Sequence, residues 1–215
     1  MLRDWLKQRW VGTTIVTTMV LAYAPTLARE VTFSDGPEIA AAVASLGVIH
    51  PTGYPLFTMV AHVFTRLLIL PIEICLKIEI FNACCALGAA FFASHGAREL
   101  VAQVVEEPAD GYQLDLAALF AGLLVGLAPE LWSQVRIPEV YAFHVLLTSA
   151  AAFMWIRHET TRKPRYVLAA ALLMGMGLSH HVTMVYMLPA AFVYLLASRP
   201  GMFINWLAAP PARLY

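Results

Sequence analysis

Residues 10–28 read WVGTTIVTTMVLAYAPTLA, and residues 29–38 continue as REVTFSDGPE. The first stretch has 19 residues and no charge, which is close to the length that a helix needs to cross a bilayer. The second places two carboxylates, Asp35 and Glu38, directly after it. Because burying a charge in a bilayer is costly, acids so close to an apolar span indicate a function. The stretch therefore predicts a membrane protein with chemistry at the membrane surface.

The composition supports the same class. Hydrophobic residues make up 60% of the chain and charged residues only 13%, whereas soluble domains are about half apolar and a quarter charged. The formal net charge is zero, so no basic surface is available for nucleic acid, and we expect none as a partner. The three cysteines lie in or beside apolar runs without the spacing of a zinc site, and we interpret them as packing residues.

Seven apolar runs follow one another along the chain. They cover approximately residues 10–28, 54–70, 74–95, 115–132, 140–156, 165–179 and 182–198. The first run, after the basic segment Met1–Arg9, resembles a secretory signal, and Thr26–Ala28 vaguely resembles its cleavage site. We favour a retained membrane anchor, because 19 residues are long for a signal core and more hydrophobic segments follow.

Basic residues predict which ends of the runs face the cytoplasm. Arg3, Lys7 and Arg9 precede the first run, and a second basic cluster, residues 157–165, separates the fifth from the sixth. The positive-inside tendency places both clusters in the cytoplasm, so an even number of crossings must separate them. Five runs lie between them, and one of these therefore does not cross. The weakest is 54–70, which carries a histidine and an arginine between two prolines and is expected to lie in the interface plane or to re-enter from one side.

The predicted fold is an all-α, polytopic transmembrane bundle with about six crossings and both termini in the cytoplasm. The chain reads as one domain over residues 1–215, with a cytoplasmic N-terminus (1–9), an outer loop with juxtamembrane or re-entrant helices (29–73) and a cytoplasmic loop (96–114). In the alternative topology, 54–70 crosses and the basic loop lies outside. We expect an integral protein of a bacterial inner membrane with its active loops in the periplasm, which corresponds to the lumen of the endoplasmic reticulum in a eukaryote.

This topology gathers several polar residues near the outer face. They are Asp35, Glu38, His50, Arg136, Glu139, Tyr141, His180 and His181. For the two acids there is also a structural interpretation, because Asp-x-x-Glu ahead of the helical pattern Ile39–Leu46 is typical of a capping box. Both interpretations can hold, since a carboxylate at a helix start is well placed to act as a base.

The remaining candidates also have two interpretations each. The stretch HPTGYP, residues 50–55, is a turn by composition, and His50 either belongs to a rigid corner or donates to an anionic ligand. Arg136 and Glu139 either neutralise each other or provide an arginine fork for phosphate. His180 and His181 point about 100° apart on a helix and so seldom bind one ion, and we expect no metal. Such a polar pair between apolar runs more often marks a bend or a substrate cavity.

Four motifs in this order resemble one family. They are DGPE (35–38), LGVIHPTGYPL (46–56), WSQ with EVY (132–141) and GLSHH (177–181). This order is similar to a family once catalogued as a domain of unknown function, which includes transmembrane protein 260, resembles the protein O-mannosyltransferases and belongs to the GT-C superfamily of membrane glycosyltransferases. The similarity extends from about Asp35 to Pro189. Pro37 and Thr52 depart from the usual Asp-Ser-Gly-Glu and His-Pro-Pro-Gly, but the spacing of the acids is kept.

The resemblance implies a GT-C-like N-terminal module and a sugar donor, such as a mannose-like hexose, carried on a polyprenyl phosphate. It implies transfer to an acceptor hydroxyl at the outer face, with Asp35 as the catalytic base and Glu38 as the second acid. His50 and Tyr54 of the His-Pro motif would line the same site. Arg136, Glu139 and the histidine pair would complete the substrate and donor-phosphate site. No cofactor is expected beyond the lipid-linked donor, and the partners would be membrane lipid and this donor.

The chain is shorter than the enzymes of this family, which carry more membrane helices. We therefore expect a truncated homologue, the product of a split gene, or a module used as a subunit of a larger assembly. The leading hypothesis is a lipid-phosphate-sugar-dependent glycosyltransferase. The alternative is a non-catalytic GT-C-like structural subunit of a membrane complex, with other membrane subunits as partners. A small transporter is a weaker third hypothesis, because no repeated half is found.

Overall fold

The computed structural model describes residues 2–28, 35–51, 53–105 and 110–198. Every element in these ranges is helical, which confirms the predicted all-α class, and no strand occurs in them. The elements are α1 (Leu2–Tyr23), α2 (Gly36–Ser45), α3 (Pro55–Leu67), α4 (Ile74–Val104), α5 (Gly111–Gly126), α6 (Pro129–Val135), α7 (Tyr141–Thr161), α8 (Pro164–His180), the 3-10 helix η1 (Val182–Tyr186) and α9 (Met187–Ser198).

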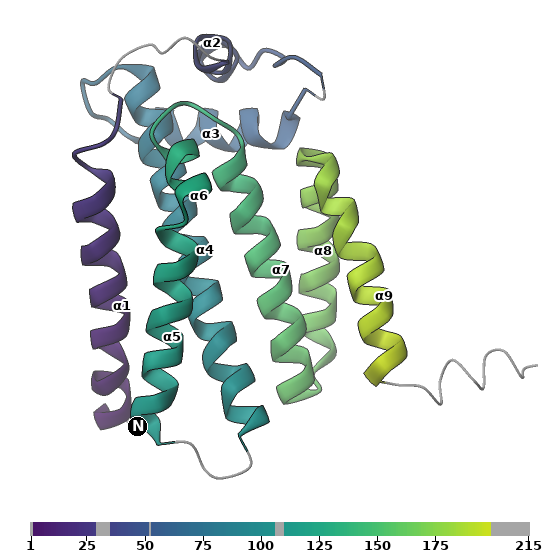
Figure 1. The fold of residues 1–215 in the computed structure, drawn as a ribbon. Helices are drawn as coiled ribbons and strands as arrows, with labels where there is room; N and C mark the ends of the chain where they lie inside the picture. The colour runs from purple at the N-terminus through teal and green to yellow at the C-terminus, as the bar shows by residue number, and fades with distance from the viewer. Residues whose placement is uncertain (1, 29–34, 52, 106–109, 199–215) are drawn as a thin grey trace, which may run out of the picture.

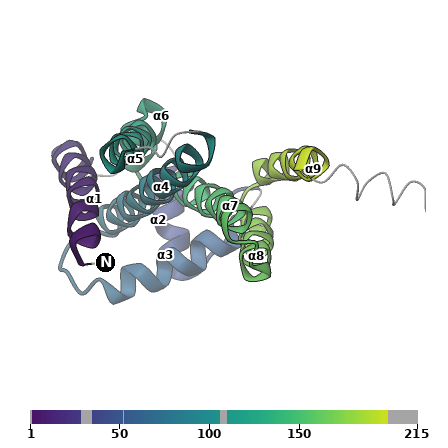
Figure 2. The same cartoon turned by 90° about the horizontal axis from the view of Figure 1, so that it is seen from below.

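The long helices α1, α4, α5, α7, α8 and α9 lie side by side along one direction, and α2 and α3 lie across one end of this bundle (Figure 1). Seen along the bundle, α4 occupies the centre, with α1 and α5 on one side and α7, α8 and α9 on the other (Figure 2). Helix α4 packs against α5 and α7, and α7 packs against α8. The run 54–70 thus forms a helix that crosses the end of the bundle, as its predicted place outside the crossings requires.

Small residues allow the central helices to approach each other closely. At Gly122 of α5, an added Cβ would lie 3.2 Å from the carbonyl oxygen of Ala90 and 3.2 Å from the Cβ of Ser94, both on α4. These distances are shorter than ordinary carbon contacts, so only glycine fits at this crossing without a shift of the helices. Such small residues are typical of helix contacts in membrane proteins.

An aromatic cluster fastens α3 to the end of the bundle. The ring of Phe57 on α3 lies with its centroid 5.8 Å from that of Phe81 on α4, 6.4 Å from that of Phe143 on α7 and 6.1 Å from that of His180 on α8. Phe57 is completely buried. Because aromatic side chains bury a large area each, this contact fixes the position of α3, and with it the turn that precedes α3.

Two elements differ from the expected runs. The run 115–132 is broken into α5 and α6, which are bent by 55° relative to each other, because Pro129 provides no N–H and disfavours a helical residue before it. The run 74–95 is longer than expected, since α4 continues to Val104. Ion pairs from α4 hold this extension, with Arg98 bound to Asp115 and Glu99 to Arg157. The polar connection predicted over 96–114 is correspondingly shorter.

The membrane-spanning capacity of the described helices is limited by length and composition. Helix α4, with 31 residues, is long and apolar enough to cross a bilayer alone, and the bent pair α5–α6 would make a second span if it crosses as one unit. The other described helices do not meet the same criteria. An apolar helix of this kind is compatible with membrane association, and the count of six crossings stays a prediction.

Candidate active site

The acids at the start of α2 meet the turn before α3. The side chain of Asp35, at the N-cap position, makes no capping hydrogen bond, and Glu38 lies in the first turn of the helix. Glu38 instead accepts a hydrogen bond from the backbone N–H of His50 at 2.7 Å, and its second oxygen lies 3.0 Å from His50 Nδ1. The predicted capping box is therefore wrong, because the turn offers Glu38 a backbone donor together with an imidazole.

His50 lies between the two acids. Its Nε2 is 3.8 Å from Asp35 Oδ2, on the opposite side of the ring from Glu38. The hydrogen bond from Glu38 raises the pKa of His50, and the charges of Glu38 and Asp35 add to this effect. The same contact lowers the pKa of Glu38. Ligand atoms of the three residues lie within 4.8 Å of one another, which is close enough to hold a cation, although exposed groups of this kind are also common without one.

Tyr54 connects this group to the end of α8. Gly53 and Tyr54 both adopt positive φ angles, 88° and 44°, which bring the chain sharply from His50 into α3. A bulky residue in this conformation is strained, so the packing around it must hold it there. The Tyr54 ring is buried, and its centroid lies 5.9 Å from that of His50, 5.8 Å from that of His180 and 5.9 Å from that of His181.

The loop between α6 and α7 adds a buried carboxylate. Glu139 is only 9% exposed. Burial raises the pKa of Glu139, and the negative charge of Asp35 raises it further, while His50 acts in the opposite direction. Glu139 therefore lies close enough to these residues to interact with both. Arg136 is exposed, and the described residues show no ion pair between Arg136 and Glu139, so the predicted mutual neutralisation is not observed.

Asn82 on α4 holds this loop from below. Its side-chain N–H₂ group lies 2.9 Å from the carbonyl oxygen of Glu139, 3.2 Å from that of Ile137 and 3.4 Å from that of Gln134. The residue is fully buried. Sequence reasoning missed this role, and a polar amide within a predicted crossing was the available signal.

The two histidines at the end of α8 make different contacts. His180 is buried and donates from Nε2 to the carbonyl oxygen of Val140 at 3.1 Å, which ties α8 to the α6–α7 loop. His181 lies beyond the helix end, and its Nδ1 is 2.7 Å from Thr183 Oγ1. The same hydroxyl lies 3.0 Å from His144 Nε2. His144 and Thr183 are thus neighbours of the site.

Most of the predicted residues meet in one place, which we name the end cluster. It comprises Asp35, Glu38, His50, Tyr54, Glu139, Tyr141, His180 and His181. Tyr141 belongs to it because its ring centroid lies 5.4 Å from that of His181. Arg136 is on the adjoining loop, without a contact to the cluster in the described part of the chain.

An apolar cavity opens beside the end cluster, and we name it the outer cavity. It has a volume of about 660 Å³ and lies between α5, α6 and α7. Leu124, Val125 and Val145 form part of its apolar wall, and Ser133 and Tyr141 lie on its polar side. Tyr141 therefore belongs both to the wall of the cavity and to the end cluster. The arrangement combines two exposed carboxylates, one buried carboxylate, an imidazole with a raised pKa and an apolar recess.

Comparison with known proteins identifies the family. No curated protein and no solved structure matches the chain. The model of the protein O-mannosyl-transferase TMEM260 N-terminal domain matches residues 35–202, which include every residue of the end cluster. The match covers well over half of the chain, and it begins at Asp35 itself. The chain belongs to the family of the protein O-mannosyl-transferase TMEM260 N-terminal domain.

Proposed function

We propose that the chain is a GT-C-type glycosyltransferase module that transfers a hexose, such as mannose, from a polyprenyl phosphate to an acceptor hydroxyl at the outer membrane face. The family supports a glycosyltransferase. The observation that carries the finer proposal is the end cluster itself, where Asp35 lies 3.8 Å from His50 and Glu139 is close enough to interact with both, while Tyr141 of the same cluster lines the outer cavity. A donor with a polar head and a long apolar tail needs both environments side by side.

The proposed orientation uses α1, α4, α5–α6, α7, α8 and η1–α9 as six crossings. Helix α1 has 22 residues and α7 has 21, so they extend over about 33 Å and about 32 Å, enough for a hydrocarbon core of about 30 Å. The basic connection between α7 and α8, with Arg162 and Lys163, lies at the same end as the start of α1 (Figure 1). The positive-inside tendency makes that end cytoplasmic and puts the end cluster outside.

The proposed reaction is a single displacement at the anomeric carbon. Asp35 accepts the proton of the acceptor hydroxyl while the hydroxyl oxygen forms a bond to the anomeric carbon. The bond from that carbon to the phosphate oxygen breaks, and the lipid phosphate leaves with the electron pair. Asp35 suits the role of base better than Glu38, because Glu38 is occupied by two contacts to His50. A single displacement inverts the configuration of the anomeric carbon.

The charges of the site suggest where the donor phosphate binds. The imidazole of His50 is surrounded by three carboxylates, Asp35, Glu38 and Glu139. These carboxylates would repel a further anion such as a phosphate. Arg136 is exposed on the adjoining loop and offers a fork of donors for phosphate. We therefore place the phosphate at Arg136, away from the three carboxylates, with the polyprenyl chain in the outer cavity and the hexose directed towards Asp35.

The alternative function is a non-catalytic subunit of a membrane complex. It is supported by the packing of the bundle and does not depend on chemistry in the end cluster. Close helix contacts through small residues such as Gly122 also suit packing against further helices. In this case the end cluster would be a structural joint between α2, α3 and the bundle.

The test is sugar transfer in membranes that contain the full chain, supplied with a labelled polyprenyl-phosphate hexose. An enzyme is expected to transfer label to a hydroxyl acceptor well above the level of membranes without the chain. Absence of transfer with several donors, together with copurification of the chain in a fixed ratio with other membrane subunits, would refute the proposal and support the alternative.

A further inference from the structure

His181 and His180 differ in the nitrogen that each leaves open. Nε2 of His180 donates to the carbonyl oxygen of Val140, and the ring is buried, including its Nδ1. His181 is only partly buried, and no hydrogen bond to its Nε2 is found in the described part of the chain. Of the two rings, that of His181 is therefore the one that can present a nitrogen to a ligand in the end cluster.

Contacts with Thr183 determine which nitrogen of His181 carries the proton. The backbone N–H of Thr183 donates to Nδ1 of His181 at 3.3 Å, so this nitrogen has a lone pair and no proton. The Thr183 hydroxyl lies 2.7 Å from the same nitrogen and must also be a donor to it. Its oxygen in turn accepts from Nε2 of His144, at 3.0 Å. Because a neutral imidazole carries one proton, the proton of His181 is on Nε2, which makes this nitrogen a hydrogen-bond donor.

The imidazole of His181 lies beside two tyrosine rings. The ring of Tyr54 is stacked on it at an interplanar angle of 25°, and the ring of Tyr141 is tilted by 56°. Burial lowers the pKa of His181, so the imidazole is neutral at neutral pH. The phenol of Tyr141 is close enough to Asp35 to interact with its charge. The open N–H of His181 therefore lies on the same side of the bundle as the proposed base.

A neutral donor beside aromatic rings suits a sugar better than a phosphate. Hydroxyl oxygens of a sugar accept hydrogen bonds from neutral donors, and the C–H faces of its ring can pack on aromatic side chains. A phosphate is bound more strongly by a charged donor such as a guanidinium. Arg136 provides such a donor on the adjoining loop, so the two functions can be divided between Arg136 and His181.

We infer that His181 donates a hydrogen bond from Nε2 to a hydroxyl oxygen of the hexose, and that Thr183 is the positioning residue that holds His181 in this tautomer. The inference rests on the lipid-linked hexose of the proposed function. It does not rest on transfer of that hexose, because it concerns only how the sugar is bound.

The tautomer is tested by nitrogen NMR of the full chain with isotope-labelled histidine rings, where His181 is assigned by the loss of its signals in His181→Phe. At neutral pH, Nδ1 should resonate as an unprotonated nitrogen and Nε2 as a protonated one. Thr183→Val keeps only the longer backbone contact and should shift both signals towards a mixture of tautomers, whereas Thr183→Ser should restore them. The control is Thr65→Val, which removes a buried hydroxyl bonded to the carbonyl oxygen of His62.

A protonated Nδ1 in the original chain would overturn the inference. Signals that are unchanged in Thr183→Val would overturn the role of Thr183, and an equal shift in Thr65→Val would show that the effect is not specific to Thr183.

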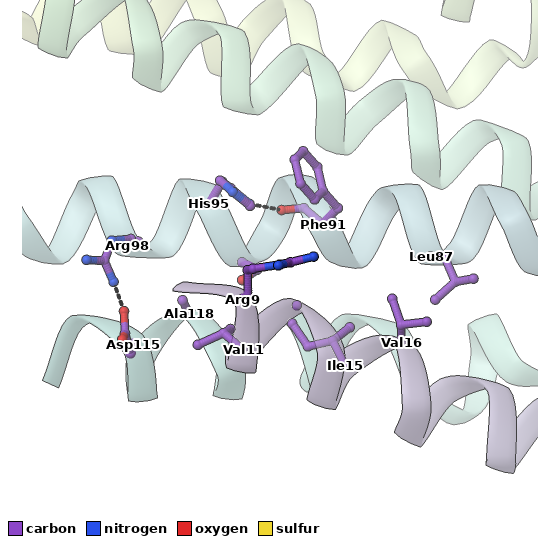
Figure 3. A pocket seen from close by; sticks show the side chains of 12 residues that line it. Arg9, Val11, Ile15, Val16, Leu87, Phe91, His95, Arg98, Asp115 and Ala118 are labelled. Atoms are coloured by element: carbon purple, nitrogen blue, oxygen red, sulfur yellow. Dashed lines mark hydrogen bonds and ion pairs between the residues drawn. The ribbon is translucent and has the colours of Figure 1, made fainter. Parts of the chain in front are cut away.

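A second cavity has to be separated from this site in any test of lipid binding. It has a volume of about 310 Å³, is bounded by α1, α4 and α5, and shares no residue with the end cluster or the outer cavity (Figure 3). At its polar end, Arg98 is bound to Asp115. A Cβ added at Gly12 in its wall would meet nothing within 4 Å. Gly12→Leu therefore places a larger side chain in this cavity and serves as the control for the binding site.

The sugar contact is tested by the affinity of the full purified chain for two probes, a polyprenyl-phosphate hexose and the same polyprenyl phosphate without the sugar. His181→Phe removes the donor but keeps a ring beside Tyr54. It should weaken binding of the hexose lipid about fivefold, as expected for one hydrogen bond, and leave binding of the polyprenyl phosphate unchanged. Gly12→Leu should bind both probes as the original chain does.

Equal weakening of both probes in His181→Phe would show a contact with the phosphate and would overturn the inference. Unchanged binding of the hexose lipid in His181→Phe, or its loss in Gly12→Leu, would overturn it as well. The predicted difference between the two probes in a chain that transfers no sugar would support the inference and refute the proposed function, so the two can fail separately.

Discussion

His50 lies in the turn before α3 and connects this turn to the two acids at the start of α2. Its imidazole contacts Glu38 on one side and approaches Asp35 on the other. Because the contact raises the pKa of His50 and lowers that of Glu38, the contribution of this pair to stability is complete between the ordinary pKa of glutamate and the ordinary pKa of histidine. It is lost as the pH rises through the raised pKa of His50. On the acid side it is lost as the pH falls through the lowered pKa of Glu38.

The substitution Glu38→Gln is therefore expected to lower the pKa of His50 towards its ordinary value. The glutamine keeps a hydrogen-bond acceptor but removes the negative charge and the strongest partner of the imidazole. The measurement is an NMR titration of the His50 ring in the full chain, compared with Glu73→Gln, an exposed carboxylate outside the end cluster. Identical titration curves in Glu38→Gln and the original chain would show that the contact does not form.

Asn82 of α4 is expected to contribute to stability through its hydrogen bonds to the α6–α7 loop. Asn82→Leu keeps the size of the side chain but leaves the carbonyl groups of Ile137 and Glu139 without their buried donor. A buried group without a hydrogen-bond partner costs about 1–3 kcal/mol. The free energy of unfolding should fall by this amount, measured by denaturation in mixed micelles. The control is Gln113→Leu, which removes an exposed amide from α5 and should change little.

An unchanged stability in Asn82→Leu would mean that the loop with Glu139 does not depend on α4. If the loop is instead displaced, sugar transfer should fall in Asn82→Leu by more than the loss of folded protein explains. Asn82 would then be a positioning residue for Glu139, since it contacts the backbone of the loop and not the reacting groups.

Helix α3 has an exposed apolar face. Met59, Val63 and Leu67 are large apolar residues spaced by four, and they are 60%, 56% and 75% exposed. This spacing puts them on one face of the helix, while Phe57 on another face packs into the bundle. An apolar face on a helix that lies across the end of a membrane bundle is expected in the interface between head groups and acyl chains.

A nitroxide label at Val63→Cys, in a chain whose native cysteines are replaced by alanine, should collide more with oxygen than with a polar nickel reagent. The same label at Ser45→Cys on α2 should show the opposite preference, because Ser45 is an exposed residue near the end of α2. If Val63 were accessible to nickel to the same degree as Ser45, α3 would face water, and the juxtamembrane position of residues 54–70 would be wrong.

The elements also show where sequence reasoning succeeds and where it fails. The apolar runs predict the helices. The requirement for an even number of crossings between the two basic clusters predicts that residues 54–70 do not run parallel to the other helices. Proline chemistry predicts a bend at Pro129, whereas the apolar run 115–132 alone predicts one straight segment. The extension of α4 to Val104 depends on ion pairs such as Arg98–Asp115. The two residues of such a pair are separated along the chain, so no periodic sequence pattern indicates that they meet. Likewise, the contact between Glu38 and His50 overrides a local capping pattern.

At the scale of the whole molecule, the topology brings four distant motifs to one end of the bundle. The turn at Tyr54, the loop at Glu139 and the helix end at His180 meet there although they are far apart in sequence. The sequence predicted this gathering from crossing parity, because alternate connections of a bundle share a face. It did not predict Asn82 or Thr183, whose roles depend on the packing of α4 and η1.

The central claim is that sugar transfer takes place in the end cluster with Asp35 as the base. The most direct measurement is the initial rate of hexose transfer from a labelled polyprenyl phosphate by Asp35→Asn, compared at equal expression with the original chain and with Glu73→Gln. Loss of a general base predicts a fall of about a hundredfold or more in Asp35→Asn and little change in Glu73→Gln. Equal transfer by Asp35→Asn and the original chain would contradict the claim and place the chemistry elsewhere.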